Sequence, residues 1–208
     1  MSKYQRYQDY VIKDGKFVGE FEEMYKDFDD PWDQSFRESG VLSKFVIEKI
    51  LDNWRITRPY EIGCGLGYFV ERMRVLRGVA GGMDISKTAI RRAKTLFPQC
   101  QFDCGDILDV DLVRNFNPDC NFLDEVTWYV LPKLEEFKLR LSENFSGCGF
   151  IHTLRQYPAG EQSYGNEFFE DLHGFMDFFG ACVEISEWGN FGSKVDRCLH
   201  TFFAGVVR

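Results

Sequence analysis

The residues with the clearest chemical potential form one short segment, Glu61-Ile62-Gly63-Cys64-Gly65-Leu66-Gly67. Glycine allows a backbone to turn tightly and to approach a bound ligand closely. The segment joins a short predicted strand to a predicted helix that begins near Tyr68. N–H groups at the start of a helix attract a carboxylate or a phosphate. The segment therefore predicts a binding loop for a nucleotide-like ligand.

The spacing of these glycines argues against a dinucleotide site, which needs the pattern G-x-G-x-x-G. Counted from Gly63, the third glycine position holds Tyr68, and counted from Gly65 it holds Val70. The observed pattern, acid-x-G-x-G-x-G, resembles motif I of class I S-adenosylmethionine (SAM)-dependent methyltransferases. This resemblance implies that Glu61 helps to hold the SAM amino group and that the glycines pass under its methionine end.

Two acids follow the next predicted strands. A carboxylate at a strand end, such as Asp84, can accept hydrogen bonds from both ribose hydroxyls of a nucleoside. The alternative is that Asp84 interacts with the dipole of the helix beginning at Lys87. The resemblance implies that Asp106 accepts from the adenine amino group; the alternative is an ordinary loop aspartate. The predicted cofactor-binding residues are Glu61, Gly63, Gly65, Gly67, Asp84, Ile85, Asp106, Ile107 and Leu123.

A methyl acceptor would lie near the end of the fourth predicted strand, at Asp124-Glu125-Val126-Thr127-Trp128-Tyr129. Carboxylates there could orient an acceptor or take its proton, and aromatic rings attract cations. Alternatively, Trp128 and Tyr129 pack a helix against the sheet. His152 follows the fifth predicted strand and could be a general base for a hydroxyl acceptor, or simply a hydrogen-bonded histidine at a strand end. We predict Glu125 and His152 as the catalytic residues.

The loop after the fifth predicted strand is rich in hydrogen-bonding and aromatic groups, which suits a polar acceptor such as a sugar. Three aromatic residues near the N-terminus, Tyr25, Phe28 and Trp32, are predicted to form part of a lid. The predicted substrate-binding residues are Tyr25, Trp32, Trp128, Tyr129, Gln156, Tyr157, Gln162 and Tyr164.

Several of these segments together resemble small-molecule methyltransferases of the nodulation type, which methylate sugar amines. The resemblance runs from Asp30 to Leu131 and includes Asp30-Pro31-Trp32 and Asp84-Ile85-Ser86. It implies SAM as cofactor, S-adenosylhomocysteine (SAH) as product, and methyl transfer to a hydroxyl or amine of a small polar molecule such as a sugar. The alternatives are a protein or RNA methyltransferase, or a non-catalytic SAM-binding subunit.

Strand and helix patterns alternate from Pro59 onward, which predicts an α/β, Rossmann-like, doubly wound sheet of about seven strands, mostly parallel. No helix separates the last two predicted strands, 183–188 and 199–207, so we expect an antiparallel C-terminal hairpin. One domain is predicted over 1–208, with an N-terminal helical lid or cap (1–55) and a SAM-binding core (56–208).

Two helices have specific signals. Residues 41–51 carry apolar side chains at positions 42, 45, 46 and 50, a spacing that predicts an amphipathic helix. Ser86 precedes a predicted helix over 87–96 and suits its N-cap.

Composition limits the function further. The net charge of −8 argues against nucleic acid as partner. The chain has no apolar run of the roughly 18 residues that a membrane span needs, and it has no secretory signal, so a cytoplasmic location is expected. The seven scattered cysteines fit reduced thiols. With no metal-ligand pattern, metal-independent chemistry is expected, in a monomer or homodimer.

Overall fold

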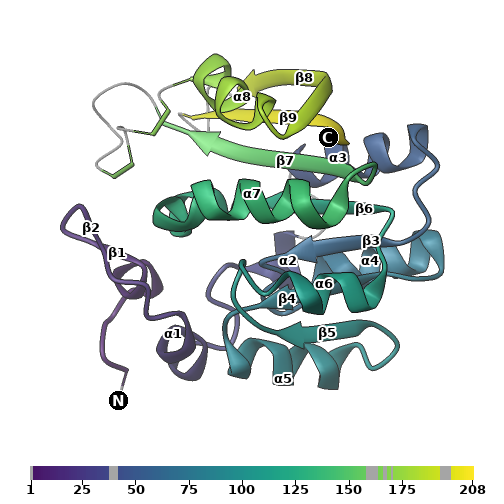
Figure 1. Cartoon of the computed structure of the whole chain (residues 1–208). Coiled ribbons are helices and arrows are strands. Elements are labelled where there is room, and N and C mark those ends of the chain that lie inside the picture. The colour runs from purple at the N-terminus through teal and green to yellow at the C-terminus, as the bar shows by residue number, and fades with distance from the viewer. Residues whose placement is uncertain (1, 38–41, 158–163, 166–167, 170, 193–197) are drawn as a thin grey trace.

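A computed structural model describes residues 2–37, 42–157, 164–165, 168–169, 171–192 and 198–208. Seven strands form one sheet in the order β5-β4-β3-β6-β7-β9-β8 (Figure 1). The strands are β3 Pro59–Ile62, β4 Gly81–Asp84, β5 Gln101–Cys104, β6 Cys120–Asp124, β7 Gly149–Gln156, β8 Val183–Gly192 and β9 Leu199–Val207. This arrangement confirms the predicted fold class.

The first five strands of this sheet run parallel. From β3 the chain proceeds outward through β4 to β5 and then returns to place β6 on the other side of β3. The carboxyl ends of β3 and β6 therefore flank the point at which the strand order reverses. Open α/β sheets bind their ligands in the crevice beyond such a point.

The C-terminal hairpin completes the sheet. Strand β9 pairs antiparallel with both β7 and β8, so β8 forms the outer edge. Buried and exposed side chains do not alternate along β9 as they do along β8, because β9 lies inside the sheet and is covered on both faces. Strand β7 extends to Gln156, and its last residues pair with the start of β9.

Helices cover both faces of the sheet (Figure 1). The helices α3 Leu42–Asn53, α4 Tyr68–Arg77 and α5 Lys87–Leu96 bury side chains in one hydrophobic cluster. The helices α6 Val110–Phe116, α7 Leu134–Phe145 and α8 Leu172–Gly180 contribute to the other. Ser86 caps α5 as predicted, accepting from the Ala89 N–H. Helix α8 has its N-cap at Asp171, which accepts from the Gly174 N–H.

The buried face of α3 follows its predicted apolar positions only in part: Val46 and Ile50 pack in the core, but Leu42 and Phe45 do not. Leu42 and Phe45 are 53% and 65% exposed, whereas Ser43 and Lys44 are 1% and 8% exposed. Successive residues are about 100° apart around a helix, so a small rotation of the helix about its axis is enough to bury one residue in place of its neighbour. The helix begins with polar residues turned inward, and Ile47, Ile50 and Leu51 of later turns pack in the core.

The N-terminal segment lies at the carboxyl ends of the parallel strands, on the left in Figure 1. It contains a short 3₁₀ helix, Tyr7–Tyr10, the strands β1 Ile12–Lys13 and β2 Lys16–Phe17, and the helices α1 Phe21–Asp27 and α2 Gln34–Arg37. The β1–β2 hairpin was not predicted. Its turn residues, Asp14 and Gly15, have φ angles of 51° and 71°, which suit an Asp-Gly hairpin turn. No helix in the described part of the chain is long and apolar enough to cross a membrane.

Candidate functional site

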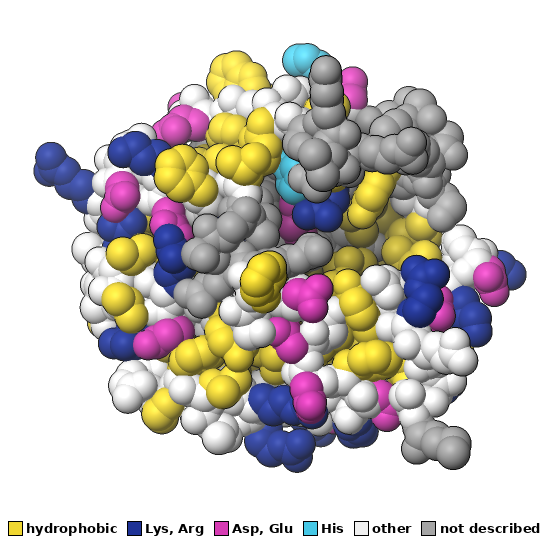
Figure 2. Space-filling model, turned by 180° about the vertical axis from the view of Figure 1, so that it is seen from behind, with side chains coloured by type: hydrophobic (Ala, Val, Ile, Leu, Met, Phe, Trp, Pro, Cys, Tyr) yellow, Lys and Arg dark blue, Asp and Glu magenta, His cyan; other side chains and the backbone are white. Residues whose placement is uncertain are grey.

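A cavity of about 740 Å³ opens beyond the carboxyl ends of β3, β4 and β6. Its walls come from the N-terminal segment, the start of α3, and the loops that follow the parallel strands. From the other side of the molecule, Figure 2 shows hydrophobic side chains gathered in a hollow right of the centre. The cavity is lined by eleven of the predicted site residues: Tyr25, Trp32, Gly63, Asp84, Ile85, Asp106, Ile107, Glu125, Trp128, Tyr129 and Tyr157.

The glycine loop between β3 and α4 is built as only glycine allows. Gly63 and Gly65 have φ angles of 87° and 56°, in the left-handed region. A Cβ atom on Gly63 would lie 2.4 Å from a methyl group of Val126, and one on Gly65 would lie 2.5 Å from Gln34 Oε1. Two other segments of the protein therefore pack closely on this loop: Val126 after β6 and Gln34 of the N-terminal segment.

Gln34 of α2 covers this loop directly. Its Oε1 accepts from the Leu66 N–H at 2.8 Å, and its Nε2 donates to the Cys64 carbonyl at 3.3 Å. This contact was not predicted, because Gln34 lies 30 residues before Cys64 in a polar stretch without a recognisable motif. Gln34 also lines the cavity.

Asp84, at the end of β4, is fixed by the backbone on both sides. Its Oδ2 accepts from the Gly65 N–H and its Oδ1 from the Ser86 N–H, each at 2.9 Å. Burial raises the pKa of this carboxyl above its usual range, while these two hydrogen bonds favour the ionised form. The carboxylate is thereby held at the cavity wall between the glycine loop and the start of α5.

Asp106, in the loop after β5, lines the cavity and is paired with Lys133. Its Oδ1 also accepts from the Leu108 N–H at 3.2 Å. Lys133 was not among the predicted site residues, although it too lines the cavity. A ligand amino group that approached Asp106 would therefore share this carboxylate with a lysine.

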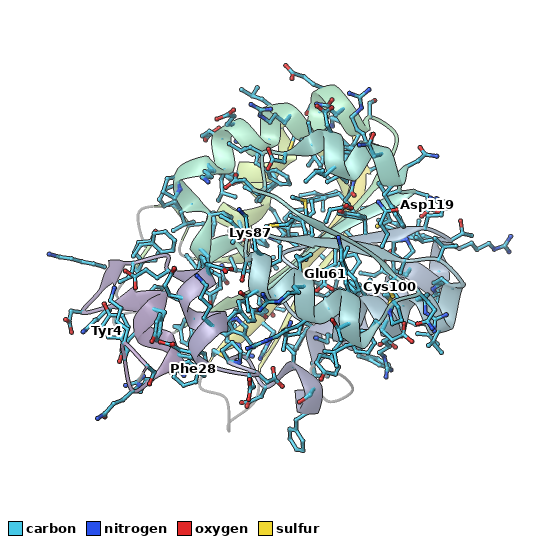
Figure 3. All side chains as sticks on the ribbon, turned by 90° about the horizontal axis from the view of Figure 1, so that it is seen from below. Tyr4, Phe28, Glu61, Lys87, Cys100 and Asp119 are labelled. Carbon is cyan, nitrogen blue, oxygen red and sulfur yellow. The ribbon has the colours of Figure 1, made fainter. Side chains whose placement is uncertain are left out.

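Glu61 lies inside the sheet rather than on the cavity wall. It is 4% exposed, and its Oε2 has no hydrogen-bond partner among the described residues. Burial raises its pKa to about 8; Lys44 opposes this rise, and Asp124 and Asp84 add to it. Figure 3 places Glu61 near the middle of the molecule, far from Tyr4 in the N-terminal segment. Burial thus favours the neutral form of Glu61, which lies at the end of β3 next to the glycine loop.

Ser43 and Lys44, at the start of α3, are two polar residues of the cavity wall that were not predicted. Lys44 Nζ lies 4.8 Å from the centre of the Phe69 ring, at the beginning of α4. They were not predicted, because the apolar pattern of this helix placed Leu42 and Phe45, rather than Ser43 and Lys44, on its buried face.

Glu125 lines the opposite part of the cavity and has a φ angle of 62°. Its Oε2 accepts from the Arg155 N–H at 2.8 Å, and its Oε1 lies 3.5 Å from His200 Nδ1. A non-glycine residue in this conformation costs about 1–3 kcal/mol, and such strain is concentrated at functional sites. Strands β6, β7 and β9 thus converge to hold one carboxylate at the cavity.

Aromatic side chains surround this end of the cavity. Tyr129 packs against Trp32 and Phe21, with ring centres 5.6 and 5.7 Å apart. Phe17 of β2 stacks on Tyr164, with ring centres 5.9 Å apart and planes 15° apart. These contacts join the N-terminal segment to the segments that follow β6 and β7.

His152 lies in the core, where it does not reach the cavity, and this placement corrects its predicted role as a base. It is fully buried, its ring packs against the rings of Phe150, Phe175, Phe179 and Phe203, and it is hydrogen-bonded to Thr127. Burial lowers its pKa to about 3. A general base must contact the proton that it removes, and His152 has no path to an acceptor in the cavity.

The remaining predicted residues lie around the cavity rather than on its wall. Leu123 and Gln156 are buried in the sheet, at 0% and 4% exposure. Gly65 and Gly67 shape the loop without lining the cavity. Gln162 lies outside the described residues. Among those that are described, no three His, Cys, Asp or Glu side chains group to hold a metal ion.

No protein-family model and no curated protein matches the chain. Solved structures do resemble it. The N-methyltransferase NodS from Bradyrhizobium japonicum WM9, in complex with SAH, shares 17% identity over 86% of this chain and 93% of its own, with a TM-score of 0.64. A SAM-dependent methyltransferase from Clostridium acetobutylicum shares 16% over 88% and 98%, with a TM-score of 0.63.

A third structure, DesVI from Streptomyces venezuelae, shares 14% identity over 86% of this chain and 98% of its own, with a TM-score of 0.62. At such low identity these likenesses speak for the arrangement of helices and strands. The chain has the fold of the class I SAM-dependent methyltransferases.

Proposed function

We propose that this protein transfers a methyl group from SAM to an amine or hydroxyl of a small polar molecule, such as a sugar derivative. The observation that carries this proposal is the order of groups along the cavity. The glycine loop, Asp84 and Asp106 follow three successive parallel strands and reach one continuous cavity. A nucleoside with an amino-acid chain needs contacts of these types in this order.

The residues present fit SAM. Asp84 offers a carboxylate held by two backbone N–H groups for the ribose hydroxyls. Ile85 and Ile107 line the cavity between Asp84 and Asp106, where an adenine ring would lie. The unpartnered buried oxygen of Glu61 lies behind the loop that would face the methionine end. A volume of about 740 Å³ falls within the usual range for small-molecule sites.

SAM supplies an already activated methyl group, so the protein must chiefly bring the acceptor into line with it. The aromatic residues Trp32, Trp128 and Tyr129 would enclose the acceptor and exclude water. Glu125 would accept a hydrogen bond from the acceptor and take its proton as the new bond to carbon forms. The strained backbone of Glu125 and the hydrogen bond from the Arg155 N–H hold its carboxylate in place for this task.

A small acceptor is favoured because the same aromatic residues close the cavity from the side of the N-terminal segment. NodS, whose fold this chain shares, is described as an N-methyltransferase. Turnover on amines or on neutral sugars distinguishes nitrogen from oxygen as the acceptor atom.

The cofactor part of this proposal is tested by calorimetric titration with SAM and SAH. Asp84→Asn should weaken SAM binding by about 10- to 100-fold, since a charge-assisted pair of hydrogen bonds is lost. Asp111→Asn is the matched control, because Asp111 is exposed on α6 and lies outside the cavity. Absence of SAM binding by the unaltered protein would refute the proposal.

The catalytic part is tested with methyl-labelled SAM and a panel of amino sugars, neutral sugars and small amines. Glu125→Gln should retain SAM affinity within about twofold and lose most of its turnover, on the order of 10²-fold or more. SAM binding without turnover on any acceptor of the panel would favour a non-catalytic SAM-binding role instead.

A further inference from the structure

Ser43 and Lys44 form a polar pair at the cavity wall that the chemistry described above does not use. Both are buried, at 1% and 8% exposure, and both line the cavity. Ser43 Oγ has no hydrogen-bond partner among the described residues, and none of them forms an ion pair with Lys44. A buried ammonium without a counterion is costly in free energy. The pair therefore requires an anion that the described protein groups do not supply.

Glu61 is the carboxyl group that interacts with Lys44 most directly, but among the described residues no ion pair joins the two side chains, and Glu61 Oε2 has no hydrogen-bond partner. Burial and the acidic neighbours Asp124 and Asp84 raise its pKa and so favour its neutral form. The positive charge of Lys44 is therefore directed to the cavity, near the beginning of α4, where its Nζ lies above the Phe69 ring.

The backbone of the glycine loop offers no competing anion site. Gly63 and Cys64 donate their N–H groups to the Met83 carbonyl, at 2.8 and 2.9 Å, and Gly67 donates to the Cys64 carbonyl at 3.0 Å. The Gly65 N–H donates to Asp84, and the Leu66 N–H donates to Gln34. These five N–H groups are all occupied within the protein, so an anionic group must find its donors outside residues 63–67.

We propose that Ser43 and Lys44 bind the carboxylate at the amino-acid end of SAM, an inference that rests on the proposed function. Lys44 supplies the positive charge and Ser43 donates its hydroxyl hydrogen. Together with Glu61, which interacts with Lys44, they place a cation and a carboxyl group near the end of the cavity that would hold a zwitterion.

The experiment compares three ligands that differ only at this end. SAM carries the carboxylate, decarboxylated SAM lacks the carboxylate alone, and 5′-methylthioadenosine lacks the whole amino-acid chain. The unaltered protein should bind SAM about 10- to 100-fold more tightly than decarboxylated SAM, as expected for one charged hydrogen-bonding contact. Lys44→Met should abolish most of this preference, and Lys44→Arg should retain part of it.

The controls separate a local effect from damage to the fold. Lys49→Met, an exposed lysine on the same helix, should leave the preference unchanged. The affinity of Lys44→Met for 5′-methylthioadenosine should stay within about twofold of that of the unaltered protein, because this ligand does not reach Lys44. Ser43→Ala, which removes a single hydroxyl, repeats the test if Lys44→Met does not fold, and it should reduce the preference by about three- to tenfold.

Three outcomes would overturn the inference. If Lys44→Met keeps the full preference for SAM, or if the unaltered protein does not distinguish SAM from decarboxylated SAM, the carboxylate is bound elsewhere, although the proposed function stands. If the unaltered protein binds none of the three ligands, the proposed function fails together with this inference.

Discussion

Two buried ionisable side chains, Glu61 and His152, show how burial changes what a residue can do. Burial raises the pKa of Glu61 to about 8, and burial lowers the pKa of His152 to about 3. Both changes favour the neutral form. Glu61 is adjacent to Lys44 and to the glycine loop and so remains close to the cavity, whereas His152 is enclosed by four phenylalanine rings.

The burial of His152 gives a prediction about stability and pH. In the unfolded chain this histidine binds a proton below about pH 6.5, but in the folded protein it stays neutral down to about pH 3. The unfolded state therefore binds more protons in this window, so the histidine destabilises the fold as the pH falls, by up to about 1.4 kcal/mol per pH unit. In His152→Leu this contribution to the pH dependence should disappear.

The measurement is urea unfolding at several pH values between 6.5 and 4, with His173→Leu as the control, since His173 is exposed on α8. The variant is expected to lose stability at neutral pH, because Thr127 loses its partner, but its curve should be flatter than that of the unaltered protein. Parallel curves would show that His152 is accessible to protons in the folded state.

At the scale of single elements, one carboxylate of α1 makes three hydrogen bonds to residues at the start of α5. Glu22 accepts from the Ser86 hydroxyl at 2.8 Å and from the Thr88 N–H and hydroxyl at 3.0 and 2.9 Å. Partial burial opposes its ionisation, but these hydrogen bonds prevail and lower its pKa to about 2. Because Ser86 also donates its N–H to Asp84, Glu22 links the N-terminal segment to the proposed ribose site.

Glu22→Gln should therefore destabilise the protein by about 1–2 kcal/mol at pH 7, since a neutral amide accepts these bonds less strongly. The folded pKa is depressed, so this contribution is complete above about pH 4.5 and is lost as the pH falls toward 2. Urea unfolding at pH 7 and pH 3 measures the difference, which should shrink at pH 3. Glu23→Gln, on the same helix with only an ion pair to Lys26, should change stability by less than about 0.5 kcal/mol. An equal effect of both variants would contradict the role of Glu22.

The elements that could be predicted are those with long patterns. The alternation of strands and helices from Pro59 onward, the Ser86 cap and the C-terminal hairpin follow from periodicity and capping, and the described residues confirm them. The β1–β2 hairpin escaped prediction because strands of two residues carry no periodicity. The buried face at the start of α3 was not predicted, because its first turn buries the polar residues Ser43 and Lys44, which line the cavity.

The candidate site divides in the same way. Asp84 and Asp106 could be placed because each follows a strand directly in a parallel sheet. Gln34, Lys44 and Lys133 could not, because their positions depend on how distant segments pack across the cavity. The buried position of His152 depends on phenylalanine residues from β7, α8 and β9 and could not be read from its own neighbours.

At the scale of the whole molecule, the cavity is the place where the N-terminal segment and the sheet meet. The segment has its own small cluster, in which Tyr10, Met24 and Tyr25 pack with Leu66 and Ala89 of the core. The cavity wall takes residues from both parts. A ligand that fills it must contact both, so binding and the attachment of the N-terminal segment should be thermodynamically coupled.

This coupling predicts the effect of SAH on the whole chain. At about 100 times its dissociation constant, SAH should raise the free energy of unfolding by about 2.7 kcal/mol, if it binds only the folded state. Hydrogen exchange should slow both in residues 21–36 and in residues 120–129, because both segments line the cavity. In Glu22→Gln the first segment should be less protected without ligand and should gain more protection on binding. Protection confined to the glycine loop and the end of β4 would show that the N-terminal segment does not close over the ligand.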